Sequence, residues 1–346
     1  MRFGLFGGAS RGAGQDGDSQ SYRAFIDYVV EAERLGFESV FLVEHHFTGT
    51  GQLSASLTLL SYLAGLTKTM RLGTAVTVMP WHNPVLLAEQ AATVDLVSDG
   101  RLDFGVGRGY RPNEFHGFRV DPGEAQARYE EALELVLKCW TTKERFSFDG
   151  RFWHFRDVIV EPHPAQAPNP PIWIAAGSEG SIRQAARRGQ HVLLDQFGTI
   201  EQTAARVAWY KDEQKKCGRT SQAGEIAVTR GLLLVDQEEK RATEIDRRLA
   251  AIAFLSATSQ IPGTKAEGPT KFGSSTLDTS REAAEASTIV GQPEECIRRI
   301  RALEEAGVDY ILFNDPWGGV ERLRHFARAV MPEFLAPTKS GMAMAG

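Results

Sequence analysis

The sequence predicts an α/β protein built as a (β/α)8 TIM barrel. Strand-like apolar runs alternate with amphipathic helical stretches along almost the whole chain, which is the pattern of successive βα units with parallel strands. Eight such strand candidates occur, and none has the polar character of an edge strand. A closed barrel is therefore favoured over the alternative, an open doubly wound sheet.

Short apolar runs bounded by turn residues predict the strands. We expect them at residues 2–6, 38–43, 70–79, 101–107, 172–176, 191–194, 226–235 and 310–313. Apolar positions at helical spacing predict the helices. These are expected at 22–35, 54–66, 84–97, 124–140, 181–188, 200–217, 238–257, 293–306 and 320–331.

Two segments depart from this alternation. Residues 145–160 contain two period-two runs around Asp149–Gly150, which predicts a β-hairpin on the rim of the barrel. Residues 258–287 are polar, glycine-containing and weakly periodic, which predicts a long lid insertion, mobile or disordered. We expect a single domain over 1–337, followed by a disordered tail over 338–346.

Composition and charge exclude several classes of protein. Hydrophobic residues make up 42% and charged residues 24% of the 346 positions, as in ordinary soluble domains. A formal charge of −5 leaves no basic footprint for nucleic acid. Three widely spaced cysteines without C-x-x-C spacing favour a reducing compartment over a disulfide framework or a thiolate metal site. No signal-peptide pattern or membrane-length apolar run occurs, so we expect a cytoplasmic protein without a membrane partner.

Glu44, His45 and His46 stand where the second predicted strand ends. Titratable side chains at strand ends are typical of active sites in parallel α/β proteins. Successive strand residues point to opposite faces, and the spacing differs from the i, i+4 pair of a helical metal site, so a zinc site is not expected. Histidine suits acid–base chemistry near neutral pH. The alternative is a histidine that only binds backbone groups, and the spacing alone leaves both open.

The segment GVGRGY combines an arginine with bare glycines. Gly105, Gly107 and Gly109 share one side of the strand, where a flat ligand or another backbone could come close. Arg108 supplies a permanent cation with a fork suited to phosphate. The dinucleotide motif G-x-G-x-x-G is absent, and Pro112 stands where its helix should begin. The alternative is a structural glycine bulge with Arg108 in an ion pair, and the pattern alone favours it.

The segment AGSEGS, from Ala176 to Ser181, lies between a predicted strand and a predicted helix. Its backbone N–H groups and hydroxyls would converge at a helix start and favour an anion there. An ordinary serine N-cap is the alternative. Glu179 would repel a phosphate, so its side chain must point away or cap the helix. Because a barrel brings strand ends together at one mouth, Arg108 and this segment could hold the same phosphate.

Several segments, in this order, resemble the bacterial luciferase-like flavin monooxygenases, most closely their luciferase alpha-type branch. They are VEHHFT, GTAVTVMPWHNPVLLAEQ, DLVSDGRLDFGVGRGY, PPIWIAAGSEGS and VGQPEECIRRIRALEEAGVDYILF. The resemblance implies a barrel that binds reduced FMN, supplied by a separate NAD(P)H:flavin reductase. Oxygen would then form a flavin peroxide that oxygenates a small organic substrate. The resemblance and the low polarity of helix 54–66 also imply a homodimer through this helix and helix 84–97.

Site residues follow from the resemblance position by position. His45 matches the catalytic histidine, with Glu44 beside it, and Ala75–Val76 matches a non-proline cis peptide that faces the flavin ring. Arg108 matches the phosphate-binding arginine, and Tyr110 lies where backbone contact is expected. The other positions assigned to the cofactor are Ala176, Gly177, Ser178, Gly180 and Ser181 at the phosphate, Gln196 near the ring, and Glu44.

Three positions depart from luciferase itself. Gly107 stands in place of a reactive cysteine, Gly177 in place of a glutamate, and Gln196 in place of a tryptophan. These changes argue against light emission and a long-chain aldehyde substrate. Two alternatives stay open: a deazaflavin-dependent dehydrogenase of the same barrel superfamily, and a non-catalytic flavin-binding protein. An apolar or aromatic substrate is expected from the side chains near the pocket: Phe6, Trp81, Phe197 and the lid.

Overall fold

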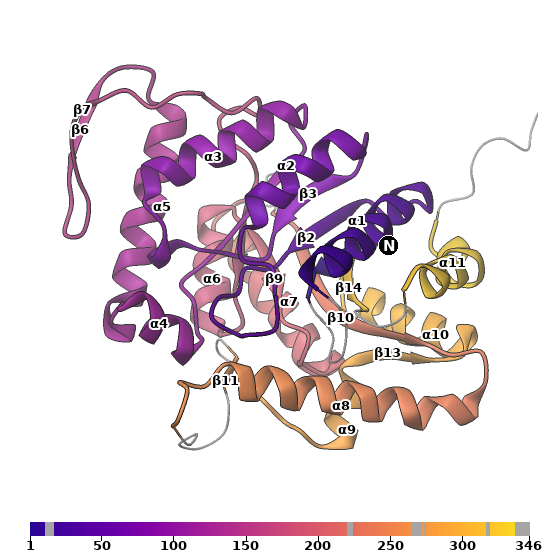
Figure 1. Cartoon of the computed structure of the whole chain (residues 1–346). Helices are drawn as coiled ribbons and strands as arrows, with labels where there is room; N and C mark the ends of the chain where they lie inside the picture. Colours follow the sequence, from indigo (N-terminus) through magenta and orange to yellow (C-terminus); the bar gives the residue numbers. More distant parts are fainter. Residues whose placement is uncertain (11–16, 220–223, 265–270, 273–274, 316–318, 336–346) are drawn as a thin grey trace, which may run out of the picture.

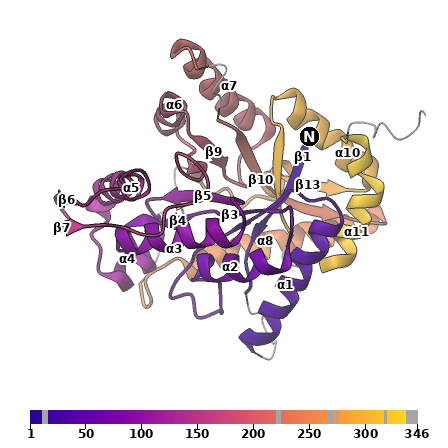
Figure 2. The same cartoon turned by 90° about the horizontal axis from the view of Figure 1, so that it is seen from above.

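A parallel β-barrel forms the centre of the computed structural model, with helices packed around it (Figures 1 and 2). The structure describes residues 1–10, 17–219, 224–264, 271–272, 275–315 and 319–335. The predicted tail over 338–346 and parts of the predicted lid lie outside the described residues.

Parallel pairing closes the barrel strands into a ring of eight positions. In order these are β1 (Arg2–Gly7), β2 (Ser39–Leu42), β3 (Arg71–Thr74) continued by β4 (Thr77–Val78), β5 (Leu102–Gly107), β8 (Ile172–Ala175), β9 (His191–Leu194), β10 (Ile226–Leu234) and β14 (Tyr310–Asn314). The ring closes because β10 pairs with both β9 and β14, and β14 pairs with β1. The predicted (β/α)8 barrel is confirmed.

Helices surround this ring. They are α1 (Asp18–Arg34), α2 (Ser56–Leu66), α3 (Pro84–Val97), α4 (Pro112–Phe118), α5 (Ala125–Thr141), α6 (Glu179–Arg188), α7 (Ile200–Lys216), α8 (Arg241–Thr258), α9 (Arg281–Ala286), α10 (Pro293–Glu305) and α11 (Gly319–Ala329). Of these, α4, α8 and α9 lie at one end of the ring. All helices predicted from periodicity are present, and α4 and α9 are additional.

Alternate strand residues fill two separate layers, because successive side chains point to opposite faces of a strand. Val40 and Phe104 pack outward against the helices. Phe41 and Trp173 pack inside the ring, with ring centroids 5.3 Å apart. The ring interior is therefore a packed core and not a pore.

Ion pairs close the end of the barrel where the strands begin. Buried Asp103 accepts from Nε of Arg71 through Oδ2 (2.7 Å) and from Nη2 through Oδ1 (2.7 Å). Arg2 donates to Glu38 (2.7 Å) and to Glu225 (2.5 Å). These five charged side chains thus have partners of opposite sign, which offsets the cost of removing them from water.

The third predicted strand, 70–79, is interrupted. β3 ends at Thr74, β4 has two residues, and a 3-10 turn, η1 (Met79–Trp81), follows. The peptide bond between Ala75 and Val76 is cis, as the resemblance implies.

Neighbouring protein groups fill the space beside Gly105 and Gly107. A Cβ on Gly105 would lie 1.7 Å from the carbonyl oxygen of Thr74, and one on Gly107 would lie 2.6 Å from Cγ2 of Val76. The Thr74 hydroxyl also donates to the Gly105 carbonyl (2.7 Å) and accepts from its N–H (2.9 Å). Close approach of the β3–β4 connection, and not of a flat ligand, explains these two glycines.

The rim hairpin is present, but its predicted turn is wrong. β6 (Phe146–Asp149) pairs antiparallel with β7 (His154–Val158), and Asp149 lies opposite His154. The loop therefore runs over 150–153 instead of turning at Asp149–Gly150. Glu131 of α5 explains the wider loop, because its carboxylate accepts the backbone N–H groups of residues 151–153 at 2.8 to 2.9 Å.

The predicted lid over 258–287 is more regular than its composition indicates. β11 (Lys271–Phe272) pairs with β12 (Ser275–Thr276), and α9 follows. Figure 1 shows α8, α9 and β11 at the same end of the barrel as α4. One further strand, β13 (Thr288–Gly291), pairs with the last four residues of β10 outside the ring. The sequence reasoning missed it because a run of four residues is too short to show a period.

Replacement of Gly105 by alanine should destabilise the protein strongly. The new methyl group would overlap a backbone carbonyl that cannot rotate away, so we expect a loss of about 2 kcal/mol or more in the free energy of unfolding. Urea denaturation followed by circular dichroism measures it. Gly65→Ala in α2 is the matched control, since a Cβ there meets nothing within 4 Å, and it should stabilise the helix by about 0.5–1 kcal/mol. Equal stability of the two variants would contradict the close approach described above.

Candidate active site

The predicted site residues lie at one rim of the barrel, because all strands of a parallel ring end on the same side. His45 follows β2, Arg108 follows β5, Gly177 follows β8, and Gln196 follows β9. β5 pairs directly with β8. The arginine and the AGSEGS segment therefore leave neighbouring strand ends.

Glu44 joins β2 to the turn after β4. Its Oε1 accepts from Nε2 of His46 (3.0 Å) and of His82 (2.9 Å), and its Oε2 accepts from the backbone N–H of Val78 (3.4 Å). Burial alone would raise the pKa of Glu44, but the hydrogen bonds and charge of the two histidines outweigh it and lower that pKa. The buried carboxylate is thus ionised and satisfied by protein groups.

His45 binds a different carboxylate, Glu114 of α4. Nδ1 of His45 lies 3.2 Å from Oε1 of Glu114, and the same oxygen accepts the backbone N–H of His46 (3.0 Å). Because this oxygen is an acceptor, Nδ1 carries the imidazole proton and Nε2 is left as an acceptor. The His45 side chain is 15% exposed, while Glu114 is buried. Nε2 makes no hydrogen bond to any described residue.

The surroundings of His45 favour its neutral form. Burial lowers the pKa of His45, the Arg111 guanidinium lowers it further, and Glu114 only partly reverses the effect. The pKa of His45 therefore lies below the ordinary value of a histidine, which favours the neutral ring near pH 7. Tyr110 stands edge-on to this ring at 6.4 Å, and burial raises the pKa of its phenol. An uncharged proton acceptor and an uncharged phenol thus lie side by side.

The sequence reasoning missed α4 and with it Glu114. The prediction that no helix begins at Pro112 is wrong, because proline is well tolerated at the first helical position. A proline followed two residues later by an acid is the available signal for a helix start. Trp81 anchors α4 by packing against Phe115 (4.8 Å) and Phe118 (5.0 Å), and Asn113 donates to the His46 carbonyl (3.2 Å).

Arg108 is exposed and forms no ion pair or hydrogen bond with any described residue. The alternative reading, a structural ion pair within the described part of the chain, is therefore not observed. Its guanidinium keeps its donors available at the end of β5.

The AGSEGS segment forms the start of α6, with Ser178 as its N-cap. Ser178 Oγ accepts from the Ser181 N–H (3.3 Å), and the two hydroxyl oxygens lie 2.9 Å apart. A Cβ on Gly180 would meet nothing within 4 Å. Glu179 binds Arg183 one turn along the helix (2.8 Å). The carboxylate that would repel a phosphate is thus already paired with a cation.

The remaining predicted residues lie toward the inside of the rim. Ala75 and Val76 pack against the ring-interior cluster, together with Phe6. Gln196 is buried and accepts from Nδ2 of Asn314 at the end of β14 (3.1 Å). This hydrogen bond links the ends of β9 and β14.

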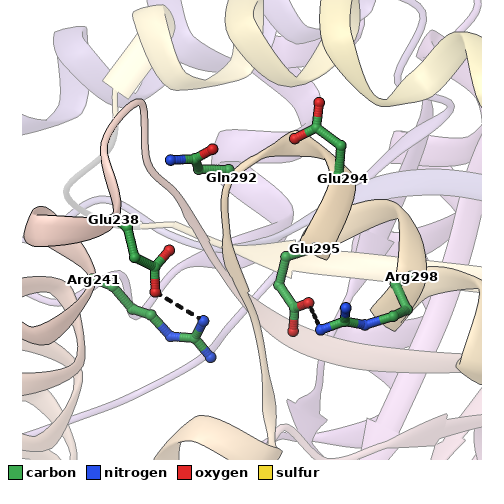
Figure 3. Close-up of a pocket in the computed structure, with 6 residues that line it drawn as sticks. All are labelled: Glu238, Arg241, Gln292, Glu294, Glu295 and Arg298. Atoms are coloured by element: carbon green, nitrogen blue, oxygen red, sulfur yellow. Dashed lines mark hydrogen bonds and ion pairs between the residues drawn. The ribbon is translucent and has the colours of Figure 1, made fainter.

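A shallow hollow of about 450 Å³ beside the start of α10 involves none of these residues (Figure 3). Its lining is Glu238, Arg241, Gln292, Glu294, Glu295 and Arg298. Arg241 donates to Glu238 (3.2 Å), and Arg298 pairs with Glu295. Because its cations already bind neighbouring carboxylates, the hollow does not compete with the rim as a ligand site.

Within the described ranges, no group of three or more His, Cys, Asp or Glu side chains is arranged to hold a metal ion. None of the described helices combines the length and the apolar character needed to span a membrane.

Relatives of this chain include flavin-dependent enzymes. The chain is 28% identical to the oxygenase component of a flavin-dependent trigonelline monooxygenase of Acinetobacter baylyi, over 96% of each chain. It is 26% identical to an F420-dependent glucose-6-phosphate dehydrogenase of Amycolatopsis mediterranei, over 91% of this chain and 95% of that protein. It is 34% identical to the uncharacterised protein y4vJ of Sinorhizobium fredii over 56% of this chain, so it spans only about half, 55%, of y4vJ.

Solved structures agree with the barrel. Monooxygenase RslO1 of Streptomyces bottropensis superposes with a TM-score of 0.83 and 26% identity, over 97% of this chain and 100% of that one. The oxygenating constituent of 3,6-diketocamphane monooxygenase of Pseudomonas putida, in complex with FMN, superposes with a TM-score of 0.74 over 97% of this chain and 99% of that one. At 19% identity the second likeness concerns the fold alone.

The family described as luciferase-like monooxygenase matches residues 1–310, almost the whole described barrel. The chain therefore belongs to the luciferase-like monooxygenase family and is an enzyme of its flavin-dependent type.

Proposed function

We propose that this chain is the oxygenase component of a two-component FMN-dependent monooxygenase. It would take reduced FMN from an NAD(P)H:flavin reductase and use O2 to oxygenate a small organic substrate. Reduced FMN supplies the two electrons, so that one oxygen atom enters the substrate and the other leaves as water. The observation that carries the proposal is the unpaired Arg108 beside the start of α6, on the rim that also holds a neutral His45.

The residues at the ends of β5 and β8 fit a phosphate monoester. Arg108 offers a free guanidinium, and the start of α6 offers backbone N–H groups and the positive end of a helix dipole. The Ser181 hydroxyl donates to the Ser178 carbonyl (2.9 Å) and lies 2.9 Å from the Ser178 hydroxyl, so both hydroxyls would turn from these bonds to donate to the phosphate. Open space at Gly180 leaves room for the phosphate oxygens. The other positions that we assign to the cofactor are Ala75, Val76, Tyr110, Ala176, Gly177 and Gln196.

His45 is proposed as the catalytic residue. With its proton on Nδ1 held by Glu114, the ring keeps Nε2 as an acceptor that no described residue uses. A neutral imidazole at pH 7 can accept a proton from the substrate or hold a hydrogen bond to the transferring oxygen. Glu114 is a positioning residue, because it holds the ring and sets its tautomer. Glu44 acts on the cofactor site indirectly, through His46 and His82.

The lid segment is proposed to exclude water from this rim. Leu277, from the predicted lid, packs with Ile252 of α8 in a buried cluster. Tyr110 and Phe197, from the loops after β5 and β9, pack against the same cluster. An apolar cover over these loops would exclude water, so that oxygen is transferred to the substrate and is not released as hydrogen peroxide.

A deazaflavin-dependent dehydrogenase is the second candidate, favoured by the F420-dependent relative. Both cofactors carry a phosphate and a tricyclic ring, so the same rim would serve either one. Assays with reduced FMN and O2, and separately with oxidised F420, distinguish them, because a dehydrogenase transfers a hydride from its substrate to the oxidised cofactor. Oxygenated product formed with reduced FMN supports the monooxygenase, whereas F420 reduction without oxygen uptake supports the dehydrogenase.

A homodimer through α2 and α3 belongs to the same proposal. Both helices expose large apolar side chains, namely Tyr62, Leu66, Leu86, Leu96 and Val97. Exposed apolar surface concentrated on two adjacent helices is typical of a protein–protein interface. A second copy of the chain would cover it.

His45→Ala should separate cofactor binding from oxygenation. We expect FMN affinity to stay within about threefold, while product formation falls by about 100-fold or more and hydrogen peroxide is released instead. The measurement pairs product analysis with peroxide quantification, on the substrate found by coupled oxygen-uptake screening. His116→Ala, an exposed histidine on α4, should change neither quantity. Unchanged product formation in His45→Ala would remove His45 from the mechanism.

Glu114→Gln tests the role of the His45–Glu114 hydrogen bond through the pH dependence of activity. Glu114 raises the pKa of His45, so its removal should lower that pKa further. If activity needs neutral His45, the acidic limb of the profile should move to lower pH. A shift to higher pH would contradict the assigned roles.

Arg108→Met should weaken FMN binding without affecting riboflavin, which lacks the phosphate. Loss of a charge-assisted fork predicts roughly 10- to 100-fold weaker FMN binding in a fluorescence titration. Arg188→Met, which removes an exposed charge at the far end of α6, should leave both affinities unchanged. Equal losses for FMN and riboflavin in Arg108→Met would place Arg108 away from the phosphate.

Leu86→Glu should convert the dimer into a monomer. A carboxylate at a side chain that is 55% exposed costs little in the monomer but is buried unpaired in the interface. Sedimentation equilibrium at micromolar concentration measures the change. Ile159→Glu, on the hairpin side with 41% exposure, is the control and should stay dimeric. A wild-type protein that is monomeric under these conditions would refute the interface.

A further inference from the structure

Arg248 of α8 is a buried cation without a partner. Arg248 is only 3% exposed, and its Nε and Nη2 atoms have no hydrogen-bond partner among the described residues. The neighbouring cations differ: Arg247 binds Glu244, and Arg322 binds Glu244 and Asp315. Within the described part of the chain, Arg248 has no carboxylate of its own.

Other buried arginines are at least partly satisfied. Arg111 donates from Nη1 to Gln52 (3.4 Å). Arg230 donates to the Thr203 hydroxyl (2.6 Å) and to the carbonyl of Thr229 (2.9 Å). No such bond joins Arg248 to a described residue. Natural proteins rarely bury a charge in this way unless something else supplies the opposite charge.

The Arg248 guanidinium lies at the mouth of the barrel. A Cβ on Gly231 would be 3.6 Å from its Cζ atom, and the Phe197 ring centroid is 5.9 Å from it. Gly231 has the same strand parity as Ala227, which packs inside the ring, so it faces the barrel axis. The cation is thus held over the inner side of β10 and beside the loop after β9.

This location differs from that of the proposed phosphate site. Arg108 and Ser178 follow β5 and β8, whereas Gly231 and Phe197 belong to β10 and to the loop after β9. The strand order places β9 and β10 farther along the ring than β5 and β8. One anion therefore need not serve both arginines.

The charge of Arg248 persists at neutral pH. Burial lowers the pKa of Arg248 to about 10, which still leaves it protonated there. Arg230 has the opposite strand parity to Gly231 and donates to the Thr203 hydroxyl of α7, on the outer side of β10. Arg248 is thus a cation on the inner side of β10 without a carboxylate partner among the described residues, and an incoming anion would neutralise it.

Apolar and aromatic side chains surround the same region. Ile252 lies one turn along α8 from Arg248 and packs with Leu277. Tyr110 and Phe197 contact this cluster. A ligand here would meet a cation at one end and apolar surface along its body, which is the composition of sites that orient a small amphiphilic molecule.

We propose that Arg248 binds a carboxylate of the substrate, so that this enzyme acts on small organic acids with an apolar or aromatic body. The carboxylate would accept from Nε and Nη2 as a bidentate partner. The body would lie against Phe197 and Tyr110, toward His45. The inference rests on the proposed function in taking this mouth as the substrate site.

Binding of model acids to the full-length protein tests the proposal. Isothermal titration, with and without FMN, would compare benzoate, phenylacetate and hexanoate with the corresponding neutral amides. We expect at least one acid to bind ten or more times more tightly than its amide. Arg248→Met should abolish this preference and, because it removes an uncompensated buried charge, should raise the melting temperature of the unliganded protein. Arg247→Met, which removes a neighbouring surface charge, should keep the preference.

Arg248→Lys gives a second, milder variant. It keeps the charge but loses the planar fork, so it should retain part of the preference for acids. Three outcomes would overturn the proposal: no acid preferred over its amide in the wild type, an unchanged preference in both Arg248 variants, or weaker FMN binding in them with acid binding intact. The last outcome would assign Arg248 to the cofactor. Failure of FMN to bind the wild type would instead contradict the monooxygenase proposal, while acid binding is still measured on the same protein.

Discussion

Closure of the parallel strands into a ring is the constraint on which the site depends. The residues of the rim are spread from Glu44 to Asn314 along the chain, and no local segment brings them together. The pairing of β1 with β14 and of β9 with β10 turns this sequence separation into proximity at one end. The segments after β2, β3, β5, β8 and β9 then contribute the assigned residues, and the packed interior below supplies a rigid floor.

The two ends of the barrel differ in whether their charged side chains have partners of opposite sign. Where the strands begin, Arg71 and Asp103 bind each other, and Arg2 binds two glutamates. Where they end, Arg108 and Arg248 have no carboxylate partner among the described residues. The ion pairs at the first end need no ligand and stabilise the fold. At the other end, the burial of Arg248 without a partner has a cost that a bound anion would offset, and exposed Arg108 keeps its donors available, which is why we assign ligands to that end.

The sequence pattern was sufficient to predict the order of strands and helices in the barrel. It was insufficient to predict which side chains and backbone groups contact each other. Strands and helices repeat at 2.0 and 3.6 residues, so their order can be read directly from apolar positions. The partner of His45 cannot be read this way, because Glu114 lies 69 positions away on a short helix that begins with proline. The glycines after Asp103 were ambiguous for a related reason: the group that approaches Gly105 is a carbonyl on another strand. The arginine and the serines were predictable as candidates because their chemistry is local, although their common role remains a proposal.

The adjacent residues Glu44, His45 and His46 have different roles. Glu44 and His46 hold each other in place, whereas His45 is the one that we propose for catalysis. Glu44 is ionised and fully engaged by His46, His82 and a backbone N–H, so its acceptor oxygens are already used. Nε2 of His46 binds that carboxylate. His45 differs, because Glu114 takes only Nδ1 and burial keeps the ring neutral, which leaves one basic nitrogen without a partner among the described residues. A base must have an unused lone pair and a pKa low enough to be unprotonated at the working pH. Of the three side chains, only His45 meets both conditions.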